Sequence, residues 1–69
     1  MLLTDVSTER AVKAFSKLGF TIVNRGKHIG MSNGIYRITI PNHKRINPYT
    51  LKAIIKDAGI TEDDFRAVL

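Results

Sequence analysis

The segment from Met31 to Pro41, MSNGIYRITIP, constrains the fold of this chain more than any other. Asn33 and Gly34 stand between two runs of β-prone residues. This dipeptide is the strongest short-range signal for a β-hairpin, because a type I′ turn requires a positive φ at both central residues. Pro41 cannot donate a hydrogen bond to a neighbouring strand, so it ends the strand that contains it. The segment therefore predicts two antiparallel strands joined by a two-residue loop.

A two-residue loop at Asn33 and Gly34 also predicts which residues lie opposite each other and which share a face. It pairs Ser32 with Ile35 and His28 with Thr39. One face then carries Ile29, Met31, Tyr36, Ile38 and Ile40, and the other carries His28, Gly30, Ser32, Ile35, Arg37 and Thr39. We expect the first face to be the core face, because a slip of one residue would expose its apolar side chains. His28 is therefore predicted to point away from the core, on the same side as Arg37.

Three further segments carry helix signals, and one more is typical of a strand. Ser7 is a suitable N-cap for a helix over residues 8–18, and FTIVNR (residues 20–25) follows as a strand. Asn47 and Pro48 begin a second helix that ends at Gly59. Thr61 and Asp64 have the spacing of a capping box, which predicts a short third helix. The expected buried positions of the first two helices are Ala11, Ala14, Phe15, Leu18, Leu51, Ile54, Ile55 and Ala58.

The predicted order is α-β-β-β-α with a short extra C-terminal helix, and 69 residues are enough for a single domain over residues 1–69. A three-stranded antiparallel sheet with helices on one face is an α+β two-layer fold. The same order is typical of small domains that bind double-stranded RNA. The chain has no cysteine, and its two histidines lack a plausible acidic co-ligand, so we expect no disulfide, metal or cofactor.

The start of the chain, MLLTDVSTER, becomes polar after three residues, so it does not resemble a signal peptide. The longest apolar runs are too short to span a bilayer. We therefore expect a cytoplasmic protein that does not associate with membranes.

The charge of the chain is unevenly distributed. The formal net charge is +5, and the span from Arg25 to Lys56 contains seven basic residues and no acidic residue. All six acidic residues lie outside that span. A segment of one sign predicts a surface for a polyanion, and the alternative is a solvated face that serves only solubility. The basic residues of the span are Arg25, Lys27, Arg37, Lys44, Arg45, Lys52 and Lys56.

His28 is the first candidate for a functional group. Gly26 and Gly30 flank it, which predicts that a ligand can approach the backbone closely. Arg25, Lys27 and Arg37 are expected to surround it with positive charge. A lone histidine in a strand is more often structural, so these residues alone leave structural, RNA-binding and catalytic roles open.

Three other residues are weaker candidates. His43 follows Pro41 beside Lys44, and it is either an acid or base partner of His28 or a residue that caps the loop or contacts phosphate. Tyr36 is expected to pack in the core, and Tyr49 is better placed to stack on a base.

The pattern KLGFTIVNRGKH…YRITIPNH…INPYTLKAIIKDAGI resembles the HicA toxins of bacterial and archaeal toxin–antitoxin pairs. The resemblance covers nearly the whole chain and rests on the order and spacing of several short motifs. These are Leu18-Gly19-Phe20, Gly26-Lys27-His28, the stretch from Ile38 to His43, Thr50-Leu51 and Ala58-Gly59.

The resemblance implies a metal-independent endoribonuclease that cleaves messenger RNA, and a HicB-like antitoxin that covers its active site. The family's catalytic histidine corresponds to His28. Two positions depart from the family pattern. Lys27 stands where serine is usual, and Tyr49 stands where glycine is common.

The resemblance gives His28 a coherent chemistry. The 2′-hydroxyl of RNA attacks the adjacent phosphorus when a base removes its proton, and an acid protonates the leaving oxygen. A histidine can fill either role, and cations stabilise the charge that develops on the phosphorane. The residues expected to bind RNA are Arg25, Lys27, Arg37, Lys44 and Arg45.

Three other functions remain to be weighed. The first is an RNA-binding module of the same fold without catalysis, which would not need His28. The second treats the helix from residue 48 as a DNA-recognition helix, but strands precede it where a helix-turn-helix has a helix. The third is a basic surface that binds an acidic protein, which is compatible with an antitoxin partner.

Overall fold

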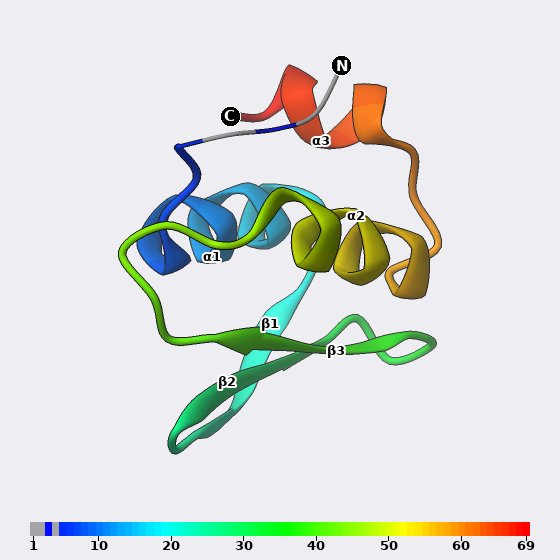
Figure 1. Cartoon of the computed structure of the whole chain (residues 1–69). Coiled ribbons are helices and arrows are strands. Elements are labelled where there is room, and N and C mark those ends of the chain that lie inside the picture. Colours follow the sequence, from blue (N-terminus) through cyan, green and yellow to red (C-terminus); the bar gives the residue numbers. More distant parts are fainter. Residues whose placement is uncertain (1–2, 4) are drawn as a thin grey trace.

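The computed structural model describes residue 3 and residues 5–69 of the chain. The elements follow in the order α1 (Thr8–Lys17), β1 (Thr21–Arg25), β2 (His28–Ser32), β3 (Arg37–Pro41), α2 (Pro48–Asp57) and α3 (Glu62–Ala67). The strands form one antiparallel sheet in the order β1-β2-β3. In Figure 1, α1 and α2 lie over one face of this sheet, and α3 lies beyond them, on the side away from the sheet. The predicted α+β fold is confirmed.

The expectation that the chain does not begin with a signal peptide rests partly on residues that the structure does not describe. Met1, Leu2 and Thr4 belong to the segment from which the lack of a signal peptide was inferred, and they lie outside the described residues. Within the described residues, no helix is long and apolar enough to cross a membrane.

Each helix begins at the cap that the sequence predicts. The Ser7 side chain accepts a hydrogen bond from the Arg10 N–H at the start of α1. Asn47 accepts from the Tyr49 N–H at the start of α2. Thr61 and Asp64 form a reciprocal capping box at the start of α3. These caps satisfy N–H groups that have no partner within the helix, which is why local sequence locates them well.

The predicted register of the β2–β3 hairpin is wrong, because the turn lies one residue later in the chain than predicted. Met31 pairs with Ile38, and His28 pairs with Pro41 rather than with Thr39. The turn is centred on Gly34 and Ile35, because the Asn33 N–H donates to the Tyr36 carbonyl at 3.2 Å.

The reason for the shift lies in the side chain of Asn33. Its oxygen accepts from the N–H groups of Ile35 (2.9 Å) and Tyr36 (2.8 Å), which holds Asn33 before the turn. Gly34 alone supplies the positive φ, as at the first central position of a type II′ turn. Moving the turn by one residue changes the partners by two, so every strand residue keeps its predicted face.

The core lies between the sheet and the helices. Met31, Ile38 and Ile40 of the predicted core face are buried, and Ile29 is half-buried. Phe15 lies at the centre, with ring centroids 5.5 Å from Phe20 and 5.0 Å from Phe65 of α3. The other buried apolar residues are Val6, Ala11, Ala14, Ile46, Leu51, Ile54, Ile55 and Ala58.

Tyr36 is the exception to the predicted core face. The shifted turn leaves it outside β3, and it is 45 % exposed. Its ring instead covers Gly59, where a Cβ would lie 2.6 Å from Cζ of Tyr36. The tip of the hairpin therefore packs against the link between α2 and α3.

This contact predicts the effect of Gly59→Ala on stability. Gly59 has a φ of 73°, and its missing Cβ leaves room for Tyr36. We expect the substitution to lower the free energy of unfolding by about 2–4 kcal/mol, through backbone strain and overpacking together. Urea denaturation measures this loss.

Gly19→Ala is the matched control. Gly19 has a φ of 96° with nothing within 4 Å of its missing Cβ, so this change adds only the backbone strain, about 1–2 kcal/mol. Equal losses in the two variants would contradict the role given to the Tyr36 contact.

Candidate nucleic-acid interface

His28 is the first residue of β2, and its side chain lies on the face of the sheet that the helices leave open. It is exposed, and it alternates with Ile29 and Met31, which face the helices. Its pairing partner is Pro41, the last residue of β3. His28 therefore stands at the end of the open face, where the β1–β2 turn meets the loop after β3.

Arg37 extends along the same face towards His28. It pairs with Ser32, and Gly30 lies between Ser32 and His28 on that face. A Cβ on Gly30 would lie 3.9 Å from Nη2 of Arg37. The guanidinium therefore lies over Gly30, and the strand carries no side chain between it and His28.

The sequence predicted that Gly30 would leave the backbone open to a ligand, but the structure shows that it does not. It is buried, because the side chains of Val23 and Asn24 cover it at 3.6 and 3.4 Å from its missing Cβ. Both side chains reach it because β1 contains a bulge between Ile22 and Asn24. Gly26, on the other side of His28, is exposed and has nothing within 4 Å of its missing Cβ. Only Gly26 offers the expected close approach.

The cations expected around His28 are divided between the two faces of the sheet. Arg25 pairs with Ile29, whose side chain faces the helices, so Arg25 lies on the helix side. Lys27 is exposed in the turn between β1 and β2. Of the three cations expected around His28, Arg37 therefore shares its face of the sheet, whereas Arg25 lies on the opposite face. The bulge in β1 left no signal in the sequence that would have shown this.

The loop after β3 is attached to the start of α1 through Thr8. The Thr8 hydroxyl lies 2.7 Å from the Pro41 carbonyl and 2.9 Å from the His43 carbonyl, and it accepts from the His43 N–H at 2.9 Å. The Thr8 N–H donates to the same His43 carbonyl at 3.2 Å. Thr8 is only 5 % exposed. Sequence reasoning did not anticipate this role, because the residues involved are far apart in the chain.

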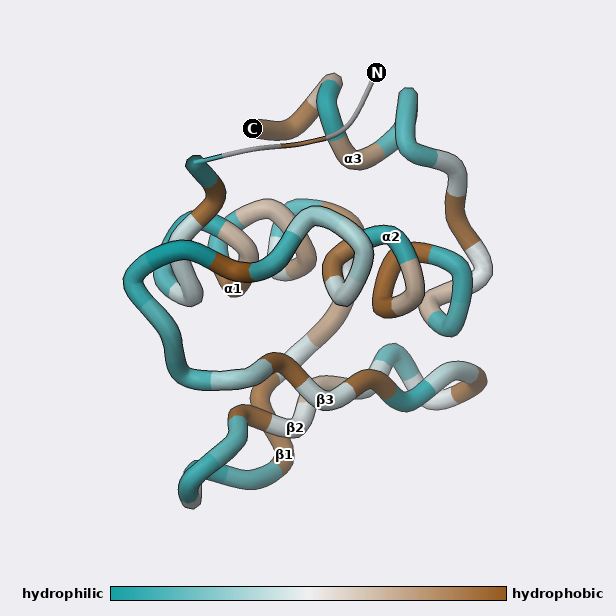
Figure 2. Tube along the Cα trace, in the orientation of Figure 1, coloured by the Kyte–Doolittle hydropathy of each residue, from teal (hydrophilic) through white to brown (hydrophobic). Residues whose placement is uncertain are grey.

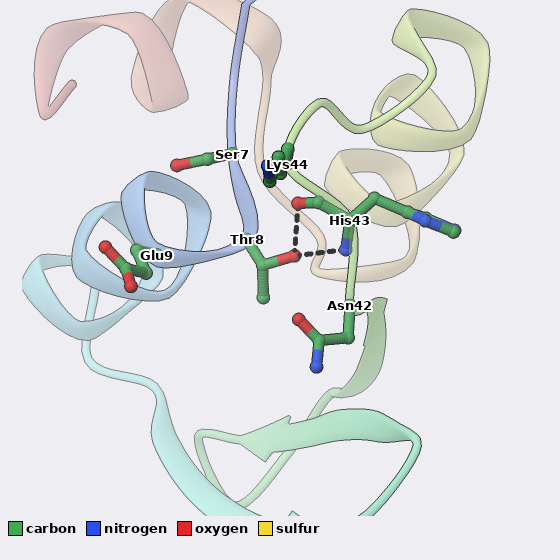
Figure 3. A pocket seen from close by; sticks show the side chains of 6 residues that line it. All are labelled: Ser7, Thr8, Glu9, Asn42, His43 and Lys44. Carbon is green, nitrogen blue, oxygen red and sulfur yellow. Dashed lines mark hydrogen bonds between the residues drawn. The ribbon is translucent and has the colours of Figure 1, made fainter.

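The side chains of the loop remain free while its backbone is held. In Figure 3 the imidazole of His43 points away from Thr8. An open hollow of about 270 Å³ separates the start of α1 from the loop and is lined by Ser7, Thr8, Glu9, Asn42, His43 and Lys44. His43 therefore has a structural role through its backbone, and its ring is exposed to ligands.

The predicted RNA-binding side chains are largely unengaged. Arg45 forms an ion pair with Asp5 at 3.3 Å, and both side chains are highly exposed, so the pair contributes little stability. Towards the described residues, no hydrogen bond or ion pair is formed by the side chains of His28, Arg25, Lys27, Arg37 and Lys44. In Figure 2, the β1–β2 turn and the loop between β3 and α2 are hydrophilic segments on the same side of the molecule.

A comparison of the sequence with protein families identifies the chain. Residues 8–60 match the family described as the HicA toxin of bacterial toxin–antitoxin systems. This chain belongs to the HicA toxin family. Membership implies an antitoxin as its partner. No curated protein and no solved structure matches the chain. The match ends at Ile60, so α3 lies beyond it, although Phe65 of α3 completes the core.

The arrangement limits the chemistry available at the interface. Among the described residues, no three His, Cys, Asp or Glu side chains are grouped so that they could hold a metal ion. The open face of the sheet offers an imidazole and a guanidinium. The helix side of the same sheet end offers Arg25, and the loop offers Lys44 and Arg45.

The contact of Thr8 with the loop predicts the effect of Thr8→Val. This change keeps the shape of the side chain but leaves the His43 N–H without its acceptor, so we expect a loss of about 2 kcal/mol in the free energy of unfolding. Hydrogen exchange should report faster exchange of the His43 amide.

Thr8→Ser keeps the hydroxyl and is the control, with a loss of about 1 kcal/mol or less for one methyl group. If the His43 amide exchanged equally fast in both variants, the hydroxyl would not be what holds the loop.

Proposed function

We propose that this HicA toxin is a metal-independent endoribonuclease that cleaves messenger RNA in the cytoplasm, with His28 as its general acid or base. The observation that carries the proposal is the position of His28. It is exposed at the end of the open face of the sheet, with the Arg37 guanidinium extended towards it over Gly30. The resemblance of Gly26-Lys27-His28 to the catalytic motif of the family supports the same role.

The proposed reaction uses a nucleophile that RNA itself contains. A base removes the proton of the 2′-hydroxyl, the oxygen attacks the adjacent phosphorus, and the bond to the 5′-oxygen breaks. The leaving oxygen takes a proton from an acid, and the products are a 2′,3′-cyclic phosphate and a 5′-hydroxyl. His28 takes one of the two proton-transfer roles, which typically contributes 10²–10⁴-fold to the rate. The complementary role falls to water or to a second group such as His43.

The cations act at two distances from the reaction. Lys27 is next to His28 in the chain, and Arg37 lies on the same open face of the sheet. Both stabilise the charge on the phosphorane oxygens. Arg25, Lys44 and Arg45 bind phosphates further along the RNA. Each such contact releases counterions, so binding weakens as salt concentration rises.

The antitoxin is proposed to be a HicB-like protein that covers His28. The open face of the sheet offers it a surface on which the catalytic group is already exposed. An antitoxin placed there blocks RNA from the imidazole and from Arg37 together.

His28→Ala tests the catalytic assignment. We expect RNA cleavage to fall by at least about 100-fold, because the side chain is exposed and its loss removes a proton-transfer group without disturbing the core. The rate is measured with purified protein and end-labelled RNA, and induced expression should no longer arrest growth. Thr39→Ala, which removes another exposed side chain from the same face of the sheet but no proton-transfer group, is the matched control.

Undiminished cleavage by folded His28→Ala protein would refute the assignment. If wild-type protein bound RNA without cutting it, the alternative of a non-catalytic RNA-binding module would hold instead.

Arg37→Gln separates catalysis from binding. We expect kcat to fall by on the order of 100-fold, because the guanidinium is placed to act on the charge of the transition state. Lys44→Gln should instead weaken RNA binding and reduce the salt slope by about 0.7, with kcat nearly unchanged. Rates at saturating RNA and affinities at several salt concentrations measure both effects, and the same pattern in the two variants would contradict the division of roles.

A further inference from the structure

A second hollow lies on the helix side of the sheet, close to the end that carries His28. It has a volume of about 440 Å³ and opens between α1 and the strands. Its apolar walls are Val12 of α1, Ile22 of β1 and Ile29 of β2, each of which is only half-buried. The hollow lies where α1, which packs more closely on β3 than on β1, faces the strands β1 and β2.

Polar side chains stand around these apolar walls. They are Glu9 and Lys13 of α1, Arg25 of β1 and Asn42 of the loop after β3. Towards the described residues, none of the four forms a hydrogen bond or an ion pair, whereas Asp5 and Glu62 are both paired with arginines. Apolar walls with a few unengaged polar groups are the usual composition of a small-ligand site.

The hollow adjoins the proposed catalytic group through the chain itself. Ile29 follows His28 in β2, and Arg25 precedes it across the turn that contains Gly26 and Lys27. RNA that passes over this turn meets Lys27 at the turn and Arg25 at the rim of the hollow. A nucleotide beside the cleaved bond can therefore place its base on the helix side while the phosphate faces His28.

We infer that this hollow binds a guanine base of the RNA substrate next to the bond that is cut. The inference rests on the proposed endoribonuclease function. A base presents two flat apolar faces, which match the apolar walls formed by Val12, Ile22 and Ile29, and a polar edge, which proteins recognise by hydrogen bonds.

Glu9 selects guanine among the four bases. Among the described residues that line the hollow, it is the one carboxylate. The Watson–Crick edge of guanine carries two adjacent donors, N1–H and N2–H, which a carboxylate accepts together, and its O6 accepts from the Asn42 amide. Uracil presents one donor between two carbonyls, and adenine and cytosine present one amino group beside an acceptor nitrogen that repels the carboxylate. Lys13 and Arg25 hold the other phosphate of this nucleotide, the one that is not cut.

Binding is tested in the full chain with His28→Ala, which prevents cleavage of the probe. The probes are fluorescein-labelled hexaribonucleotides, one of six uridines and one with a single central guanosine. We expect the guanosine probe to bind on the order of 10-fold more tightly, as for one bidentate base contact. Glu9→Ala should abolish this difference, and Asn42→Ala should reduce it.

Asp57→Ala is the matched control. It removes one exposed carboxylate from a helix elsewhere and changes the net charge equally, so general electrostatics are the same. Loss of the guanosine preference in Glu9→Ala but not in Asp57→Ala supports the inference. Equal binding of the two probes by the His28→Ala protein overturns it.

Cleavage mapping distinguishes this inference from the proposed function. On RNA of mixed sequence, the wild-type sites should share a guanine at one fixed position, and Glu9→Ala should cut without that guanine. Cleavage without any base preference overturns the guanine site and leaves the endoribonuclease intact. Guanosine-dependent binding without cleavage supports the site and overturns the endoribonuclease. If Glu9→Ala weakens only the complex with the antitoxin, a protein segment occupies the hollow and the inference is overturned.

Discussion

The attachment of the loop after β3 to the start of α1 is the contact on which the interface depends. The Ile46 N–H donates to the Val6 carbonyl at 2.8 Å, and both hydrogen-bonding groups of the His43 backbone are held by Thr8. A loop between a strand and a helix would otherwise be mobile, because it buries few side chains. Here its backbone is fixed, which places the side chains of Asn42, His43 and Lys44 beside the first hollow, and Asn42 also lines the second. The proposed binding of RNA by this loop relies on the rigidity of its backbone.

Features set by neighbouring residues could be read from the sequence. Ser7, Asn47 and Thr61 cap their helices because each satisfies an N–H group two or three residues away. The outward position of His28 was also predicted correctly, although its partner was not. The two possible turn centres differ by one residue and shift the pairing by two, so both give the same faces. The face was determined by alternation, whereas the pairing depended on the side chain of Asn33.

Features set by distant residues could not be read in this way. Tyr36 and Gly59 are separated by all of β3 and all of α2, and neither position alone signals the contact between them. The same holds for Thr8 and His43. The bulge at Val23 depends on how β1 pairs with β2, and it turns Arg25 to the helix side and closes Gly30 to ligands. The sequence shows that these cations lie in one segment of the chain, but only the strand register shows on which face of the sheet Arg25 and Arg37 lie.

The placement of Arg25 and Arg37 on opposite faces of the sheet bears on Lys27, which stands where serine is usual in the family. If all the cations had lain around His28, a lysine in place of the usual serine would have added one more charge to a single cluster. Instead Arg37 lies on the open face and Arg25 on the helix side, and Lys27 stands in the exposed turn between Arg25 and His28. In the proposed path of RNA from His28 to the hollow, the strand crosses this turn, where Gly26 has nothing within 4 Å of its missing Cβ. A hydroxyl there could donate one hydrogen bond to a phosphate, whereas the ammonium attracts the phosphate from a distance and adjusts to its position. Lys27 is thus the cation that could guide the strand from one face of the sheet to the other.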